Sequence, residues 1–200
     1  MYPVVLRLEG RRCLVVGGGG VARRKVEGLL ASGAVVTVVA PAVDDELRTD
    51  VAGAGGRLTI AERPYREEDL AGAWLAIAAT DDAAVQQQVF DDGERAGVWV
   101  NAADDPERCA LFLPAVHRRD PVIVAVSTEG TSPALAAWLR DRLAAALPPR
   151  LEELVAAVAA ERAAVQASGR STEGLDWQAR IEDLAAALDD RPSPDAGGVR

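Results

Sequence analysis

Four consecutive glycines follow a short apolar run near the start of the chain, in the sequence VVGGGGVARRK. Within this sequence, Gly17, Gly19 and Ala22 have the G-x-G-x-x-A spacing of loops that hold a dinucleotide pyrophosphate. Gly17 permits a tight turn, Gly19 lets the backbone approach the phosphates, and Ala22 allows close packing of helix on strand. The free N–H groups at the start of the helix then face the anion. The loop therefore predicts a site for NAD or NADP.

The spacing does not decide between these two cofactors. A carboxylate about 20 residues after such a loop commonly binds the ribose 2′-hydroxyl group of NAD. Here that place reads Val39-Ala40-Pro41-Ala42, and acidic residues come only at 44–46. The same place holds no arginine that could bind a 2′-phosphate. We expect backbone groups around Pro41 to bind the ribose, and NAD and NADP both stay open.

A candidate catalytic carboxylate lies after a later apolar run. Asp104 follows the run at 98–101, and a carboxylate can accept a proton or bind a hard metal ion through oxygen. Open α/β sheets bind their ligands at the carboxyl ends of strands, which favours a functional Asp104. The alternative is a plain Asp104-Asp105-Pro106 turn, because Asp and Pro are common turn residues. Asp105 is the nearby competitor for any chemical role.

Two other strand ends carry polar residues that could contact a cofactor. Thr80 ends the run at 74–80, and with the aspartates at 81–82 it is a good helix-capping residue. Capping is the main role we expect there, and a contact of Thr80 with the nicotinamide is the alternative. Asn101 ends the next run, and the same two interpretations stay open for it.

Candidate partners for an anionic ligand lie further along the chain. In TEGTSP, Thr131 or Ser132 can cap the helix that follows, and the N-terminus of that helix would attract an anion. Arg118 and Arg119 are the nearest cations, and the alternative for them is a solvated turn. His117 is the only histidine, which excludes a metal centre built on several histidines.

Short apolar runs alternate with helical stretches over the first half of the chain and must position these residues. This β-α-β order predicts an α/β fold, a Rossmann-type parallel sheet with helices on both faces. The predicted strands are 13–16, 35–40, 57–62, 74–80 and 98–101, and the predicted helices are 21–31 and about 82–95.

The second half of the chain has a different pattern. Two strands, ALFLPAV at 110–116 and PVIVAVS at 121–127, are predicted on either side of a polar HRRD turn. A long helix through about residue 146 follows, and the prolines at 148–149 end it. Further helices are predicted from residue 151 and over about 175–188.

Composition narrows the class of protein. The 200-residue chain has a net charge of −9, which argues against nucleic-acid binding because that function needs a basic surface. No apolar run reaches the roughly 18 residues of a membrane helix, and the N-terminus lacks the pattern of a signal peptide. Two cysteines give no disulfide framework. We therefore expect a cytoplasmic protein without a membrane partner.

Six motifs in a fixed order resemble one family. They are GGGGVARRK, VVAP, WLAIAATDD, VNAADDP, LFLPA and VAVSTEGTSP, spread over about residues 3–140. Together they resemble the dehydrogenase/ferrochelatase module of siroheme synthase, the precorrin-2 dehydrogenase family. The resemblance implies oxidation of precorrin-2 to sirohydrochlorin with NAD as cofactor. In bifunctional members Fe²⁺ insertion follows and gives siroheme, and the resemblance also implies a homodimer formed through the middle region.

The resemblance also assigns residues. Gly20, Val21, Pro41 and Ala42 match positions that line NAD in the family. Asp104 matches an aspartate implicated in both reactions, which would make it a catalytic residue and a ligand of the iron. Ser127 matches a serine near the tetrapyrrole cleft. The carboxylates of the substrate would then meet the cationic and helix-capping groups already described, Arg118, Arg119, Thr131 and Ser132.

On this basis we expect four regions: an NAD-binding domain (1–112), a dimerisation segment of strands and helix (113–147), a helical region of the substrate cleft (148–190) and a disordered tail (191–200). Three alternatives remain. The chain could be a regulatory module that senses NAD, a carrier that binds tetrapyrrole without turnover, or a dehydrogenase without chelatase activity.

Overall fold

The computed structural model describes residues 1–189 and divides into two compact units. Unit 1 is Met1–Leu113, and unit 2 begins at Pro114. The first boundary expected from the sequence, after residue 112, lies beside this division. The tail expected at 191–200 lies outside the described residues.

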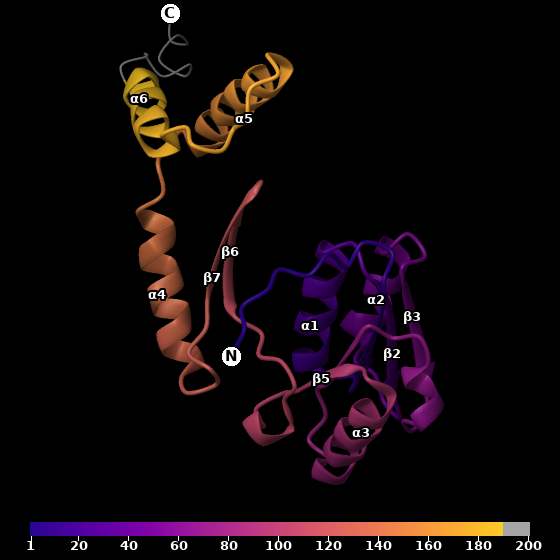
Figure 1. Cartoon of the computed structure of the whole chain (residues 1–200). Coiled ribbons are helices and arrows are strands. Elements are labelled where there is room, and N and C mark those ends of the chain that lie inside the picture. The colour runs from indigo at the N-terminus through magenta and orange to yellow at the C-terminus, as the bar shows by residue number, and fades with distance from the viewer. Residues whose placement is uncertain (190–200) are drawn as a thin grey trace, which may run out of the picture. The chain divides into compact units, whose positions relative to one another are not determined.

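Unit 1 contains a sheet of five strands in the order β3-β2-β1-β4-β5, and every neighbouring pair is parallel. Strands β2, β3 and β5 of this sheet are labelled in Figure 1. This arrangement confirms the Rossmann-type α/β fold, with β3 at an edge as expected. The strands are β1 (Arg12–Val16), β2 (Val35–Ala40), β3 (Leu58–Glu62), β4 (Leu75–Ala78) and β5 (Trp99–Ala102).

Helices cover both faces of this sheet. Alternate residues of β1 point to opposite faces, so that Val15 packs with Val26 of α1 while Val16 packs with Val89 of α3. Because each central strand is buried on both faces, its sequence is a continuous apolar run. The helices of unit 1 are α1 (Gly20–Ala31), α2 (Asp45–Gly53) and α3 (Ala83–Ala96), with 3-10 turns η1 (Glu67–Leu70) and η2 (Pro106–Arg108).

The sequence analysis did not predict α2. Its only fully buried side chain is Leu47, so it shows too little of the 3.6-residue apolar period that identifies a helix. Its sequence is rich in charged residues on the solvent side. The missed helix matters for the site, because its N-terminus lies directly after β2.

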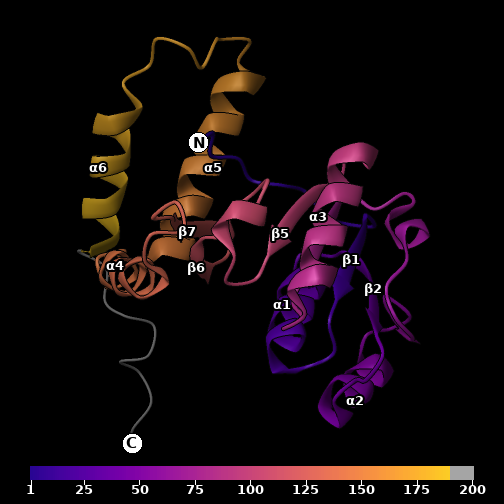
Figure 2. The ribbon, with the colours of Figure 1, turned by 90° about the horizontal axis from the view of Figure 1, so that it is seen from below.

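Unit 2 begins with an antiparallel hairpin on which one helix packs, followed by a helix pair. The strand bounds differ from the prediction: residues 110–114 are not a strand, and His117, Arg118 and Arg119 lie in β6 instead of in a turn. The turn is Asp120–Pro121, and a half-solvated hairpin accepts polar residues that a buried strand would not. The elements are β6 (Ala115–Arg119), β7 (Val122–Val126), α4 (Pro133–Ala145), α5 (Leu151–Ala167) and α6 (Trp177–Asp189). Helices α5 and α6 lie side by side (Figure 2).

Candidate cofactor site and active site

The first two glycines of the loop fit tightly against neighbouring backbone. Gly17 has a φ of 131°, and a Cβ atom built on it would lie 2.0 Å from the carbonyl oxygen of Ala79. A Cβ atom on Gly18 would lie 2.1 Å from the carbonyl oxygen of Ala42. The end of β1 therefore contacts the ends of β4 and β2 at once. The sequence analysis gave no role to Gly18, because the dinucleotide pattern leaves that position open.

The next two glycines lie in open space. A Cβ atom on Gly20 would have no neighbour within 4 Å, and the nearest atom to one on Gly19 is Oδ2 of Asp44, at 4.0 Å. Gly19 is the N-cap of α1, and no side chain caps that helix end. Ala22 is fully buried, as close packing of α1 on the sheet requires. An uncapped helix N-terminus beside open space is the cradle that a pyrophosphate fits.

Residues on the β2 side of this cradle are accessible. Pro41 and Ala42 follow the end of β2 and are exposed, and Val21 in the first turn of α1 is 37% exposed. Together with Gly19 and Gly20 they form a surface that could hold a dinucleotide. The residues present therefore fit the cofactor expected from the sequence.

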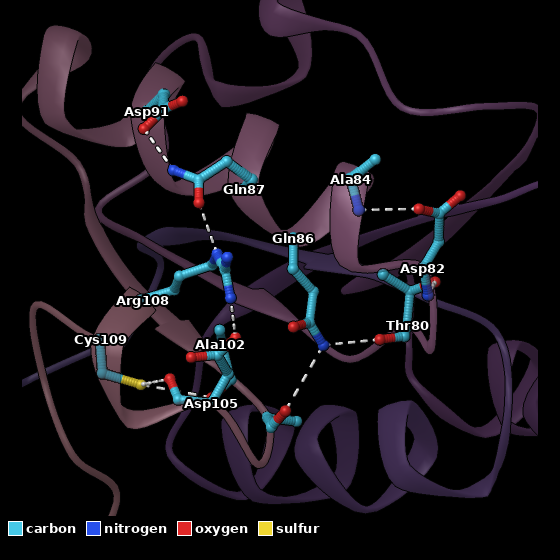
Figure 3. Close-up of polar contacts among 11 residues, drawn as sticks. Thr80, Asp82, Ala84, Gln86, Gln87, Asp91, Ala102, Asp105, Arg108 and Cys109 are labelled. Atoms are coloured by element: carbon cyan, nitrogen blue, oxygen red, sulfur yellow. Dashed lines mark hydrogen bonds and ion pairs between the residues drawn. The ribbon is translucent and has the colours of Figure 1, made fainter.

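The loop after β4 is fixed by its own side chains (Figure 3). Asp82 caps α3 by accepting hydrogen bonds from the N–H groups of Ala84 (2.9 Å) and Val85 (3.2 Å). The capping role expected here is therefore present. The buried Gln86 amide donates to the carbonyl oxygens of Thr80 (2.7 Å) and Ala103 (3.4 Å). Thr80 itself follows the carboxyl end of β4 and is partly exposed.

Gln86 was missed by the sequence analysis, although its position offered a signal. It lies one helical turn after the N-cap Asp82, and its side chain is 9% exposed. A glutamine on the inward face of an amphipathic helix needs hydrogen-bond partners, because a buried amide without them is costly. Its partners here are the backbone ends of two neighbouring strands.

Asn101 has a buried side chain that fixes the segment after the loop containing Asp104. Its amide nitrogen donates to the carbonyl oxygen of Leu111 (3.0 Å) and to Sγ of Cys109 (3.3 Å). Burial raises the pKa of the Cys109 thiol, and the positive charge of Lys25 on α1 partly opposes that rise. The structure thus places Asn101 in a supporting position at the end of β5.

Two adjacent aspartates after β5 have different surroundings. Asp105 forms an ion pair with Arg108, whose Nε atom also donates to Oε1 of Gln87 at 2.6 Å (Figure 3). Asp104 is exposed, and none of the residues described from 1 to 189 forms a hydrogen bond or ion pair with its carboxylate. Asp104 also has a φ of 61°, in the left-handed region that non-glycine residues adopt rarely and often at functional sites.

Asp104 and the cradle both follow the carboxyl ends of parallel strands, so they lie at the same end of the sheet. Helices α1 and α3 leave β1 and β4 toward opposite faces, so the strand order reverses between these two neighbours. Ligands of such sheets bind at this reversal, outside the carboxyl ends of the strands. Asp104 follows β5, two strands from β1, which is about 10 Å at the usual strand spacing.

The hydroxyl residues expected to bind substrate lie at the start of α4 in unit 2. Ser132 caps α4 by accepting from the N–H of Leu135 at 3.2 Å. Thr131 and Ser127 are exposed in the same turn, which Thr128 closes by hydrogen bonds to both backbone groups of Ser132. Ser132 and not Thr131 is therefore the capping residue.

The two arginines of β6 differ in their contacts. The Arg119 guanidinium pairs with Glu152 at 2.7 Å and donates to the carbonyl oxygens of Pro148 (2.7 Å) and Pro149. The same ion pair lowers the pKa of Glu152. Arg119 therefore fixes the turn between α4 and α5. Arg118 lies on the exposed side of the strand.

Within residues 1–189, no three side chains of His, Cys, Asp or Glu lie close enough together to hold a metal ion. In that same range, no helix is both long and apolar enough to cross a bilayer. The single histidine, His117, lies in the hairpin opposite Val124.

Comparisons with known proteins agree with the dinucleotide cradle found in unit 1. Residues 4–115 match a family described as "Putative NAD(P)-binding", and residues 119–146 match "Sirohaem biosynthesis protein central". Siroheme synthase of Pseudomonas fluorescens is 43% identical over 82% of this chain, and siroheme synthase 1 of Aeromonas salmonicida is 39% identical over 82%. The chain spans 35% of the length of each of these two proteins.

A solved structure is similar over most of the chain. SirC, a precorrin-2 dehydrogenase, is 29% identical, with a TM-score of 0.68 over 95% of this chain and 90% of its own. These matches confirm the family resemblance drawn from the six sequence motifs.

Proposed function

The chain belongs to the NAD(P)-binding family that matches residues 4–115, and we propose that it oxidises precorrin-2 to sirohydrochlorin with NAD⁺ in siroheme biosynthesis. The names of the similar proteins support this substrate, since they are siroheme synthases and a precorrin-2 dehydrogenase. The observation that carries the proposal is the exposed carboxylate of Asp104, which has no ion pair or hydrogen bond within residues 1–189 and follows β5 at the same end of the strands as the dinucleotide cradle.

The reaction removes one hydride and one proton from the tetrapyrrole. NAD⁺, when bound, supplies the ring that accepts the hydride. Asp104 accepts the proton, and its carboxylate is available because Asp105 and not Asp104 pairs with Arg108. A positioned general base contributes about 10²–10⁴-fold to such a step.

Backbone groups of the cradle would hold the cofactor. The N–H groups at Gly19, Gly20 and Val21 would bind the pyrophosphate, and Pro41 and Ala42 would border the adenosine. Gly17 and Ala22 set the turn and the helix packing that place them. Thr80 would border the nicotinamide, with Asn101 behind it.

Unit 2 would supply the contacts for the anionic substrate. Ser127, Thr131 and Ser132 surround the start of α4, where a helix N-terminus attracts carboxylates. Arg118 would add a positive charge from β6. Arg119 would act indirectly, since its guanidinium already binds Glu152 and two proline carbonyls.

We also propose that two copies pair through the apolar side of α4 and the hairpin. Leu135, Trp138 and Leu143 on α4 are 48%, 54% and 50% exposed, and Ile123 on β7 is 39% exposed. Large apolar side chains gathered on one element commonly mark an interaction surface. Because NAD is a cofactor of cytoplasmic metabolism, we also propose that the protein works in the cytoplasm.

Insertion of Fe²⁺ into sirohydrochlorin is a second candidate activity. It requires loss of two pyrrole N–H protons, which an unpaired carboxylate can accept in turn. Asp104 would serve again, as a base and as an oxygen ligand that delivers the iron. The iron is a substrate in this reaction.

An anaerobic assay with precorrin-2 and NAD⁺ tests the proposal. Formation of NADH and sirohydrochlorin is expected from the unaltered chain, and loss of at least about 100-fold in rate from Asp104→Asn. Glu94→Gln is the matched control, because Glu94 is an exposed carboxylate on α3. Adding Fe²⁺ afterwards tests the chelatase against an enzyme-free reaction.

Other outcomes identify the alternatives. Binding of NAD⁺ without NADH formation would favour a sensing module, and tight binding of precorrin-2 without turnover would favour a carrier. NADH formation that continues unchanged in Asp104→Asn would refute the role of Asp104. Oxidation of precorrin-2 with iron insertion no faster than in the enzyme-free reaction would identify a dehydrogenase without chelatase activity.

A further inference from the structure

Two aspartates hold the same position in two helices of unit 1 but use their side chains differently. Asp82 is the N-cap of α3 and accepts two hydrogen bonds from the first turn of that helix. Asp44 is the N-cap of α2 in a similar extended conformation (φ −65°, ψ 146°), yet its side chain accepts no capping hydrogen bond. An aspartate at this position normally caps its helix. The carboxylate of Asp44 therefore does not cap α2 and is available to other groups.

The carboxylate of Asp44 lies over the glycine turn. Its Oδ2 atom is the nearest atom to a Cβ built on Gly19, at 4.0 Å. The backbone of the same loop is fixed, because the N–H of Asp44 donates to the carbonyl oxygen of Gly18 at 2.9 Å. A Cβ on Gly18 would come within 2.8 Å of the Cα of Val43, so the two loops are packed closely against each other. Asp44 is thus held beside the cradle on its β2 side.

Two arginines of α1 and α2 already have acidic partners. Arg23 donates to Asp50 at 2.8 Å and to Glu46 at 2.5 Å, and Arg48 pairs with Glu62. In contrast, no described residue between 1 and 189 pairs with the Asp44 carboxylate. An additional negative group at this place would therefore meet a carboxylate and arginines that are already neutralised.

We propose that Asp44 selects NAD over NADP. This inference rests on the proposed dinucleotide site. The β2 side of such a cradle receives the adenosine ribose, and a carboxylate there accepts hydrogen bonds from the ribose hydroxyl groups. The same carboxylate repels a 2′-phosphate, and the guanidinium groups of Arg23 and Arg48 are already paired with acidic residues. The carboxylate missing from the end of β2 is supplied after the 41–43 turn, at the N-cap of α2.

Equilibrium titration of the full chain with NADH and with NADPH tests this inference. The unaltered chain is expected to bind NADH at least about tenfold more tightly than NADPH. Asp44→Asn should weaken NADH binding about tenfold and leave NADPH binding unchanged or tighter, since one charge-assisted hydrogen bond contributes about that much. Asn is a good N-cap, so α2 should stay folded, and equal urea midpoints would verify this.

Asp45→Asn is the matched control, because Asp45 is the fully exposed neighbour in the same helix turn. It should leave both affinities within about twofold. An NADH-to-NADPH preference that Asp44→Asn leaves unchanged would overturn the inference and not the proposed function. Failure of the unaltered chain to bind either nucleotide would overturn both. Selective NADH binding that depends on Asp44, without precorrin-2 oxidation, would support the inference and refute only the proposed substrate.

Discussion

The side-chain nitrogen of Gln86 lies 2.7 Å from the carbonyl oxygen of Thr80, and the same nitrogen also reaches the carbonyl oxygen of Ala103 at 3.4 Å. One buried amide therefore joins the loop after β4 to the loop after β5, directly before Asp104. Because both loops accept a hydrogen bond from the same amide, Gln86 links the positions of the residues proposed to contact the nicotinamide and to transfer the proton.

Replacing Gln86 with leucine should loosen both loops. Two backbone carbonyl groups would lose a buried donor, so we expect the free energy of unfolding to fall by about 1–3 kcal/mol. Urea unfolding followed by circular dichroism measures this. Gln88→Leu is the control, because Gln88 lies two residues further along α3 and is exposed. Equal losses in the two variants would contradict a linking role for Gln86.

Alanine at two glycines of the same loop should have opposite effects. Gly17→Ala places a Cβ atom 2.0 Å from the Ala79 carbonyl at a φ of 131°, so we expect a loss of about 3 kcal/mol or more in stability. Gly20→Ala meets no protein atom within 4 Å and should leave stability unchanged or raise it by up to about 1 kcal/mol. NADH titration of Gly20→Ala should nevertheless show about tenfold weaker binding. Unimpaired binding would mean that the cradle does not hold the cofactor.

Much of this architecture could be predicted from the sequence because buried parallel strands have continuous apolar runs and the glycine motif has fixed spacing. The position of Asp104 followed from the same rule, since it comes directly after a predicted strand. The features that the sequence analysis missed depend on contacts between segments that are distant in the sequence. Helix α2 has one buried residue, and Gly18 contacts the chain at Ala42, so neither has a local pattern.

The bounds of the hairpin in unit 2 also could not be predicted from the local sequence. The sequence HRRD has the polarity of a turn, but three of its residues lie in β6 because one side of the hairpin is solvated. The partners of Arg119 come from residues 148–152, which no local pattern indicates. The structural role of Arg119 therefore could not be predicted from the local sequence.

The two neighbouring arginines of β6 can now be separated by mutation. Arg119→Ala removes the pair with Glu152 and two hydrogen bonds to proline carbonyls, so the urea midpoint of unfolding should fall. Arg118→Ala should weaken precorrin-2 binding, because Arg118 lies on the exposed side of β6. Unfolding curves and substrate titration of both variants give the comparison. Reversed effects would refute the assignment of Arg118 to the substrate.

The stability of unit 1 should depend on pH through Asp69. A hydrogen bond from the Arg63 guanidinium lowers the pKa of this carboxyl group. Because the folded pKa lies below the unfolded value of about 3.9, the stabilisation is complete above about pH 5 and is lost as the pH falls through the lowered pKa. Asp69→Asn should therefore destabilise the chain by about 1–2 kcal/mol at pH 7, and this difference should shrink as the pH falls through the lowered pKa of Asp69.

Urea unfolding at a series of pH values measures this difference. Glu94→Gln serves as the control, because Glu94 is an exposed carboxylate in the same unit and should give a flat difference across the range. A difference between Asp69→Asn and the unaltered chain that is independent of pH would show that the ion pair does not stabilise the fold.

Glycine at position 104 should separate stability from activity. Asp104 adopts a φ of 61°, a conformation that costs a non-glycine residue about 1 kcal/mol and a glycine nothing. Asp104→Gly should therefore keep the free energy of unfolding or raise it by up to about 1 kcal/mol, while NADH formation falls at least about 100-fold. Ala103→Gly is the control, because Ala103 has no positive φ and glycine there should destabilise by about 0.5–1 kcal/mol.

Two outcomes would contradict this prediction. If Asp104→Gly destabilises the chain as much as Ala103→Gly, the backbone at Asp104 is not strained. If Asp104→Gly retains activity, the carboxylate is not the base. The expected combination, a more stable and inactive variant, would mean that the strained backbone is maintained for the chemistry.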